Sequence, residues 1–395
     1  MKILKKDKSL PKFIFLAPKK SDILVYDILS ERIISKLFTI KEIPSIKTRL
    51  EEINLFILFK IFLKFKFSFF EYVIEYIRYT EAKVVVTAID NSPVFYRIKS
   101  RLPIVTIFFQ NGQRTGHNDI FALLDKKKNF ITEKIDKAYK IHKNKNFTAY
   151  KKLFYVDLMC VFNEMTATFY KKIVTGKTLI AGSILSNEEK IFTKKKNSLL
   201  YISLFRAGRK IHKNENILIK YVNLYCIKNN LNLIVLGKHK KGTEFFEREK
   251  KYYKDVIYSK HLMIPNYKNR KTYKLVDESK IVVSPGSTLG IESVGRKNKT
   301  VIINPFPNVY PYKKKFFGYF TKRKDLGVFW YTGTNKKKIF KILKTVENYN
   351  KRKWLEKIKR FEDETTYYDF KNKKLKRRLI KFLKPKNINI RKYLN

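Results

Sequence analysis

Short apolar runs rich in β-branched residues alternate with helical stretches along most of the chain, and this alternation is what most constrains its fold. In the first half, strands are predicted at 12–18, 84–86, within 102–114, 156–163 and 177–183, with helices through 23–37 and 51–80. In the second half, strands are predicted at 199–205, 231–237, 261–265, 279–286 and 299–305. Strands that alternate with helices predict a parallel sheet covered by helices on both faces. The predicted fold class is therefore α/β, in two halves of similar size.

The polar stretch "SNEEKIFTKKKNS" at 186–198 interrupts this rhythm and marks a domain boundary. We expect an N-terminal domain over 1–187, a linker over 188–198 and a second domain over 199–340. Basic helices and a tail are expected over 341–395, where "KNKKLKRRLIKFLKPK" carries Leu and Phe on one side.

The net charge is extreme: the chain has 88 Lys and Arg residues and only 34 Asp and Glu residues, which gives +54. Such a chain is attracted to phospholipid headgroups, nucleic acids and sugar phosphates. Lys, Ile, Asn, Phe and Tyr also have A/T-rich codons, so genome composition accounts for much of the overall level. We therefore interpret only local clusters of charge functionally.

The stretch "INLFILFKIFLKFKFSFFEYVIEYI" at 53–77 is the strongest membrane candidate. Lys60, Lys64 and Lys66 interrupt it, whereas a spanning helix needs about 20 mostly apolar residues. It fits either a basic amphipathic helix lying on an anionic membrane or a core helix whose lysines point to solvent. No signal peptide is evident at the N-terminus.

Cysteine and histidine usage indicates neither a disulfide framework nor a zinc site. Cys160 and Cys226 lie far apart in apolar runs, and the five histidines are scattered. A reduced, cytoplasmic, metal-free protein is the simplest interpretation.

Small polar turns follow five of the predicted strands, at 90–93, 110–114, 182–183, 206–208 and 284–288. Ligands of open parallel sheets bind at the carboxyl ends of the strands. Two halves facing one another would therefore form a cleft with polar turns on both walls.

The turn in "IVVSPGSTLGIESVG", residues 281–295, is the most informative of these. Ser284 is a suitable N-cap, with Pro285 at the first helical position. The exposed amides and positive end of such a helix are a natural seat for a phosphate. Gly286 allows close approach of the backbone, and Ser287 and Thr288 add hydroxyl donors.

Glu292 lies four residues after Thr288, on the same helix face and one turn deeper. Its carboxylate can accept hydrogen bonds from the two ribose hydroxyls of a nucleotide whose phosphates sit at the helix start. An ordinary capped helix with a surface Glu fits the same residues. The stretch has no Gly-Lys-Ser/Thr and so is not a Walker loop.

Several segments carry a family resemblance: "VVSPGSTLGIESVGRKNKTVIIN" resembles the donor-binding segment of GT-B glycosyltransferases. The segments "AIDNSPVFYRI", "IFFQNGQR" and "CVFNEMTATFYKKI" with "AGSILSN" are similar to glycosyltransferases known as surface carbohydrate biosynthesis proteins. The resemblance spans about residues 80 to 310. It implies a GT-B-like fold of two facing Rossmann-like domains with parallel sheets and C-terminal helices, in which the second domain mainly binds a nucleotide sugar. The His-Pro motifs of polysialyltransferases are missing.

Two residues of the first half are candidates for the catalytic base. Asp90 closes a predicted strand, where a carboxylate can take a proton from an acceptor hydroxyl, but it also suits a helix cap. His117 can act as a general base, although a lone loop histidine is commonly only solvated. The neighbouring acceptor-side candidates are Asn91, Ser92, Gln110, Asn111, Gly112 and Arg114.

In the second half, Arg206 and Lys238 follow predicted strands and can neutralise a diphosphate leaving group. The Asp-x-Asp motif common in metal-dependent transferases is absent. We therefore expect no metal, with the charge met by the helix dipole and by basic side chains.

The resulting hypothesis is a bacterial, metal-independent glycosyltransferase of the GT-B type. It would move a sugar from a nucleotide-sugar donor, its co-substrate, to a lipid-linked or oligosaccharide acceptor of the lipopolysaccharide or capsule type. It needs no further cofactor and no specific nucleic acid, and is expected in the cytoplasm or on the inner face of the cell membrane. The alternatives are a nucleotide-sugar 2-epimerase of the same architecture and a nucleic-acid-binding protein, the latter suggested by charge alone.

Overall fold

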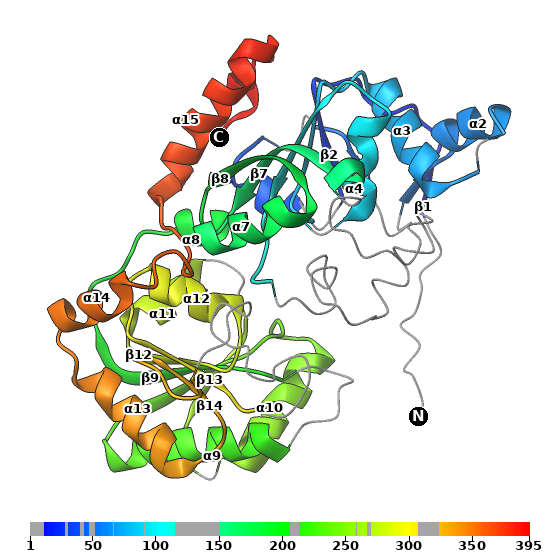
Figure 1. The fold of residues 1–395 in the computed structure, drawn as a ribbon. Helices are drawn as coiled ribbons and strands as arrows, with labels where there is room; N and C mark the ends of the chain where they lie inside the picture. The colour runs from blue at the N-terminus through cyan, green and yellow to red at the C-terminus, as the bar shows by residue number, and fades with distance from the viewer. Residues whose placement is uncertain are drawn as a thin grey trace. The chain divides into compact units, whose positions relative to one another are not determined.

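The computed structural model describes residues 12–27, 31–39, 43–46, 52–65, 67–90, 92–114, 151–205, 213–257, 259–266, 270–306 and 324–395. The chain forms two compact units, each with its own sheet (Figure 1). The first unit comprises Met1–Gly112, Gly116–Glu188 and Asp369–Asn395, and the second comprises Gln113–Thr115 and Glu189–Tyr368.

The first unit is built on a six-stranded parallel sheet with the order β3-β2-β5-β6-β7-β8. Its strands are β2 (Ile23–Tyr26), β3 (Ser45–Ile46), β5 (Val84–Thr87), β6 (Val105–Phe109), β7 (Tyr155–Val161) and β8 (Thr175–Ile180). Strands β2, β5 and β6 are buried along their whole length. Their nearly continuous apolar sequences are typical of parallel strands covered on both faces.

Helices pack around this sheet. They are α1 (Glu31–Ile34), α3 (Phe69–Thr80), α4 (Pro93–Arg97), α7 (Glu164–Ile173) and α8 (Ile184–Asn187). Of these, α3, α4, α7 and α8 begin at side-chain caps. Ser92 caps α4 and Asn163 caps α7, each accepting a hydrogen bond from the amide three residues later. A separate pair of parallel strands, β1 (Lys12–Ile14) and β4 (Glu52–Asn54), leads into α2 (Leu55–Leu63).

The second unit has a six-stranded parallel sheet with the order β11-β10-β9-β12-β13-β14. Its strands are β9 (Lys196–Ile202), β10 (Asn232–Leu236), β11 (Leu262–Ile264), β12 (Ser279–Ser284), β13 (Thr300–Asn304) and β14 (Trp330–Thr332). Its helices are α9 (Lys213–Lys228), α10 (Glu244–Val256), α11 (Arg270–Glu278), α12 (Thr288–Gly295), α13 (Lys336–Asn348) and α14 (Lys351–Lys359). In chain order the strands run 3-2-1-4-5-6, the Rossmann order. The prediction of two α/β halves with parallel sheets is confirmed.

The C-terminal helices belong to different units, which differs from the predicted division of the chain. Residues of α13 and α14, among them Leu343 and Trp354, are buried in the core of the second unit. Helix α15 (Lys373–Leu383) instead buries Leu375, Leu379 and Leu383 in the core of the first unit. The four-residue spacing of these leucines places them on one face of α15. The predicted linker also differs, because β9 already begins at Lys196.

Two helices predicted in the first half are wrong. The predicted helix through 23–37 begins instead as strand β2, whose sequence Ile-Leu-Val-Tyr is buried along its whole length. A short apolar run of this kind shows no periodicity that separates a buried strand from a buried helix. The predicted helix over 51–80 is divided into β4, α2 and α3. The break lies at Phe65, whose φ of 51° is outside the helical region.

Both cysteines are free and buried, Cys160 in β7 and Cys226 in α9. Burial raises the pKa of the Cys226 thiol to about 12 and raises that of Cys160 further. Neither thiol is therefore primed for reaction near neutral pH.

Helix α12 lies unusually close to the strand that precedes it. A Cβ atom at Gly290 would lie 2.2 Å from the Oγ atom and 2.4 Å from the Cβ atom of Ser284. The hydroxyls of Ser293 and Thr300 are 2.8 Å apart and hold the same helix to β13. Gly290 is thus needed for the close packing of α12 on the sheet.

We predict that Gly290→Ala lowers the free energy of unfolding by about 1–3 kcal/mol, because the added methyl group overpacks a site without space. Urea denaturation of the full chain measures the change. Adding Ser284→Gly, which removes the clashing Cβ, should recover part of it, with a coupling of about 0.5–3 kcal/mol between the two sites. Strictly additive effects would show that the two residues are not in contact.

Candidate functional site

The strand order of the second unit predicts that a ligand binds near β9 and β12. In open α/β sheets, ligands bind outside the carboxyl ends of the strands at the point where the strand order reverses. In this sheet β9 and β12 are neighbours and the order reverses between them. The turn that follows β12 therefore lies at the position where a ligand is expected.

Gly286 determines how this turn is built. Its φ of 105° lies in the region that only glycine adopts readily, so the helix cannot begin at this residue. Helix α12 starts at Thr288 instead, with Ser287 as its N-cap. The prediction of Ser284 as N-cap and Pro285 as first helical residue is wrong. Ser284 ends β12, and its hydroxyl accepts a hydrogen bond from the Ser287 amide at 3.2 Å.

The hydroxyl groups of the turn accept hydrogen bonds from backbone amides. The Leu289 amide donates to Ser287 Oγ over 3.4 Å, and the amide of Gln113, a residue of the same unit, donates to Thr288 Oγ1 over 2.9 Å. A hydroxyl that accepts such a bond keeps its own proton to donate. Gly286, Ser287 and Thr288 are all half-buried rather than enclosed. Together with the positive end of α12, these groups can bind an anion.

Glu292 lies one turn into α12 and is 5% exposed. The hydroxyl of Tyr273, on α11, donates to Glu292 Oε2 over 3.2 Å. The predicted neighbourhood of Thr288 and Glu292 on one helix is confirmed, but the carboxylate is not on the surface. Tyr273 holds it in place from the neighbouring helix.

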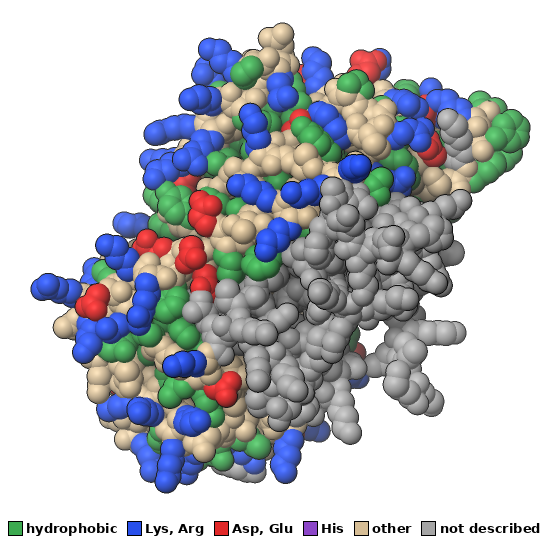
Figure 2. All heavy atoms as spheres, viewed as in Figure 1, with side chains coloured by type: hydrophobic (Ala, Val, Ile, Leu, Met, Phe, Trp, Pro, Cys, Tyr) green, Lys and Arg blue, Asp and Glu red, His purple; other side chains and the backbone are tan. Residues whose placement is uncertain are grey.

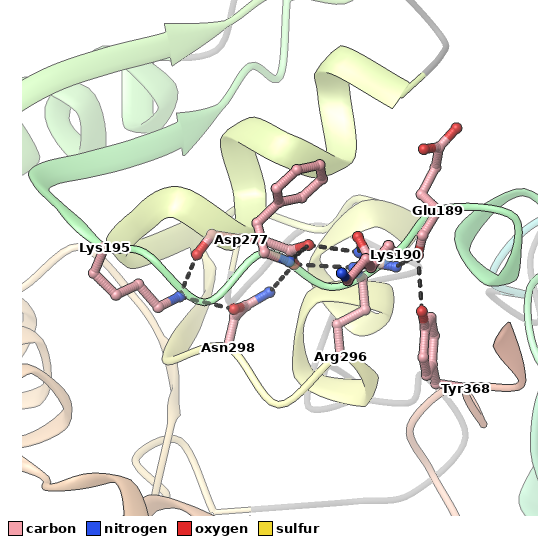
Figure 3. A network of polar contacts seen from close by, with 8 residues as sticks. Glu189, Lys190, Lys195, Asp277, Arg296, Asn298 and Tyr368 are labelled. Carbon is pink, nitrogen blue, oxygen red and sulfur yellow. Dashed lines mark hydrogen bonds and ion pairs between the residues drawn. The ribbon is translucent and has the colours of Figure 1, made fainter.

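A second polar contact joins the same two helices one turn further on. Arg296, the C-cap of α12, forms a fully buried ion pair with Asp277 of α11 (Figure 3). Burial alone would lower the pKa of Arg296, but the hydrogen bond and charge of Asp277 raise it above its ordinary value. The guanidinium also lies 5.1 Å from the ring centres of Tyr273 and Tyr368. The charge on Arg296 is therefore balanced by Asp277 and in contact with two aromatic rings.

The same ion pair fixes the segment that enters the second unit. Arg296 donates to the carbonyl oxygens of Glu189 and Lys190, each over 3.0 Å, and the Phe192 amide donates to Asp277 Oδ2 over 3.1 Å. Figure 3 shows Lys195 and Asn298 completing the network, with Lys195 Nζ 2.9 Å from Asn298 Oδ1. The region predicted as a structureless linker is thus bound tightly to the second unit.

We predict that Arg296→Met destabilises the protein by about 3–5 kcal/mol, because Asp277 is left charged and buried without its partner. Lys297→Met is the matched control, since it removes the adjacent, solvent-exposed ion pair with Glu362 and should cost about 0–1 kcal/mol. Urea denaturation of both variants makes the comparison. Equal losses would contradict the role assigned to the buried pair.

Glu249 organises the carboxyl end of the neighbouring strand β10. This fully buried carboxylate accepts the backbone amides of Lys238 at 3.0 Å and His239 at 3.2 Å, and it also accepts the Ser203 hydroxyl. Lys238 was predicted as a phosphate-binding residue from its position at the strand end. In the structure its backbone amide is held by Glu249. Ser203 and Glu249 were not predicted as site residues from the sequence. A Glu on a basic amphipathic helix, as Glu249 is, resembles any surface acid.

In the first unit, the strand order reverses between β2 and β5, and Asp90 follows β5. Asp90 is fully buried, and the Tyr170 hydroxyl donates to its carboxylate. Its Oδ1 accepts the Asn111 amide at 3.5 Å. Asp90 therefore links the turn after β5 to the turn after β6. The helix cap expected at Asp90 is instead provided by Ser92, which caps α4.

The remaining candidates of the first half have varied surroundings. Gln110 is buried, its Oε1 accepts the Phe162 amide at 2.8 Å, and its Nε2 donates to the Gly112 carbonyl over 2.9 Å. Arg114 is half-buried and belongs to the second unit. Asn91, His117 and Arg206 lie outside the described residues.

We predict that Asp90→Asn costs about 1–3 kcal/mol of stability, because the amide cannot accept at both of the carboxylate positions. Tyr170→Phe, which removes the facing donor, should cost a similar amount in thermal or urea unfolding. An Asp90→Asn protein of unchanged stability that has lost all activity would instead assign Asp90 to proton transfer.

Known proteins resemble this chain at two levels. Solved structures share its fold: the wall teichoic acid polymerase TagF (variant H548A) is 13% identical, with a TM-score of 0.53 over 94% of this chain and 91% of that chain. The UDP-GlcNAc 2-epimerase from Methanocaldococcus jannaschii is 11% identical, with a TM-score of 0.51 over 91% of this chain and 99% of that chain. A search of curated protein sequences finds no match.

The GT-B-like fold inferred from the sequence, with two Rossmann-like domains, is confirmed by these likenesses. A family model described as "putative O-antigen biosynthesis protein" matches residues 134–386, well over half of the chain. The resemblance to surface carbohydrate biosynthesis proteins is confirmed at this level. The chain belongs to the family that this model describes.

Proposed function

We propose that this protein is a glycosyltransferase that moves a sugar from a nucleotide-sugar donor to a growing bacterial surface glycan of the O-antigen type. The observation that carries the proposal is the polar turn between β12 and α12, placed at the reversal point of a Rossmann-ordered sheet. Membership of an O-antigen biosynthesis family and the fold shared with the TagF polymerase support it.

In this proposal the donor diphosphate binds at the start of α12. The Ser287 and Thr288 hydroxyls donate to phosphate oxygens while their own oxygens remain engaged by backbone amides. The partial positive charge of the helix start stabilises the diphosphate as it leaves the sugar. Basic side chains, for which Lys238 and Arg206 are candidates, provide the remaining charge without a metal ion.

Glu292 is proposed to accept hydrogen bonds from the ribose hydroxyls of the donor. Tyr273 supports this role, because its hydroxyl on one carboxylate oxygen fixes the orientation of the other. The buried ion pair one turn further along holds the two helices in register. The proposed acceptor is an oligosaccharide or a lipid-linked glycan, with Asp90 and His117 as the candidates for the base.

We predict that nucleoside diphosphates and their sugar conjugates raise the melting temperature of the full chain. A ligand at about 100 times its dissociation constant stabilises by about 2.7 kcal/mol. The double variant Ser287→Ala, Thr288→Ala should weaken nucleotide binding about tenfold or more, since a hydrogen bond to a charged group contributes about 1.5–3 kcal/mol. Thermal-shift titrations measure both the rise in melting temperature and the loss of nucleotide affinity in the double variant.

The control is Ser68→Ala, which removes the N-cap hydroxyl of α3 in the first unit and should leave nucleotide binding unchanged. Binding that is equal in the double variant and the wild type would reject the α12 start as the phosphate site. An absence of stabilisation by any nucleotide would reject the transferase itself.

A nucleotide-sugar 2-epimerase is the second candidate, because the Methanocaldococcus jannaschii epimerase has the same fold over nearly its whole length. Incubation with the donor alone separates the two activities. An epimerase changes the configuration of the sugar without an acceptor, whereas a transferase leaves the donor sugar unchanged until an acceptor is added.

A further inference from the structure

An apolar surface is concentrated at one edge of the first unit. It consists of the end of β1 and the residues after it, together with α2 and the residues that follow it, and we call it the α2 platform. Its outward side chains, with exposures from 39% to 82%, are Phe13, Phe15, Leu16, Leu58, Phe59, Phe62, Leu63, Phe65 and Phe67. Exposed apolar patches of this kind on a folded domain mark interaction sites.

Helix α2 is apolar on both sides. Ile57 and Ile61 are buried one turn apart and face the protein. On the opposite side Phe59 is 61% exposed and Phe62 is 57% exposed. A helix that is hydrophobic all round is normally buried, so the outer face of α2 is suited to an apolar environment.

The α2 platform is firmly attached to the rest of the first unit. Asn54 caps α2 through the Ile57 amide at 3.1 Å and donates to the Leu16 carbonyl over 2.8 Å, which links α2 to β1. Its backbone amide donates to the Tyr72 hydroxyl over 3.0 Å. The rings of Phe56 and Tyr79 lie 4.8 Å apart, centre to centre. The exposed side chains are therefore presented by an ordered support.

Lysines lie beside the apolar side chains of the α2 platform (Figure 2). In the described parts of 12–20 and 52–67, the lysines are Lys12, Lys19, Lys20, Lys60 and Lys64, and Glu52 is the single acidic residue. Figure 2 shows this green apolar tip, with blue side chains beside it, at the end where Figure 1 labels α2. Lys64 Nζ lies 2.7 Å from the buried Glu75, and Lys20 is paired with Glu81, so part of this charge is balanced within the protein.

We propose that the α2 platform docks on an anionic phospholipid bilayer, with its aromatic side chains inserted at the boundary of headgroups and acyl chains. Apolar side chains with lysines beside them are complementary to a surface that is apolar below and anionic above. A nine-residue helix spans only about 14 Å, which suits lying in the interface. Among the described helices, none has the length and apolar character to cross a membrane. The proposal does not depend on the transferase activity.

Vesicle flotation of the full chain tests the proposal. Vesicles of phosphatidylglycerol and phosphatidylcholine are compared with pure phosphatidylcholine, at low salt and at about 0.5 M NaCl, where the Debye length falls to about 4 Å. A protein of charge +54 binds anionic vesicles at low salt in any case. We expect the wild type to stay bound to the anionic vesicles at high salt, and Phe59→Ser with Phe62→Ser to lose at least tenfold in partitioning.

The matched control is Leu224→Ser with Ile227→Ser, which replaces two exposed apolar residues on α9 of the second unit. It should float like the wild type, and thermal melts confirm that both variants fold. If the α2 double variant floats like the wild type, or if its sole effect is to split a dimer seen by light scattering, the membrane proposal is overturned.

Fluorescence gives a direct measure of insertion. The sequence has two tryptophans, Trp330 and Trp354, and both are buried in the second unit. In a Phe62→Trp variant, the added signal should shift to the blue on vesicle binding and be quenched by brominated acyl chains. A signal that brominated lipid does not quench would place the α2 platform outside the bilayer.

Discussion

The buried ion pair between Arg296 and Asp277 is the interaction on which the geometry of the second unit depends. Asp277 lies near the end of α11, just before β12, and Arg296 caps the end of α12. One turn earlier on each helix, Tyr273 donates to Glu292. The two contacts therefore join α11 to α12 at two levels, one helical turn apart on each helix. They fix the helix that follows the turn relative to the helix that precedes the strand, so the turn itself is held from both sides.

Other buried acids near the carboxyl ends of the strands serve the backbone in a similar way. Glu249 accepts hydrogen bonds from two amides after β10 and from a serine hydroxyl after β9, and Asp90, after β5, accepts an amide and a tyrosine hydroxyl. A buried carboxylate that accepts several hydrogen bonds offsets the cost of its desolvation and prevents local movement. Loops at these strand ends are thus shaped before any ligand arrives, which is what a site for a flexible nucleotide sugar requires.

The sequence was sufficient for the α/β class, both parallel sheets and the neighbourhood of Thr288 and Glu292, because these follow from local pattern. It failed where burial on both faces hides the strand pattern, where a turn depends on an unusual backbone angle, and where a segment packs against a distant part of the chain. Strand β2 looked helical because burial on both faces removes the alternation that identifies a strand. The N-cap was misplaced because Gly286 was assigned close approach rather than a positive φ. The assignment of α15 to the first unit depends on leucines whose partners lie more than 180 residues earlier in the chain.

The central claim is that the start of α12 binds the diphosphate of a donor nucleotide. A crystal structure of the full chain with a nucleoside diphosphate tests it most directly. The claim requires phosphate oxygens within about 3 Å of the hydroxyls or amides of Ser287 and Thr288, with the ribose hydroxyls toward Glu292. A nucleotide bound elsewhere in the second unit, with this turn unchanged and unoccupied, would contradict the claim.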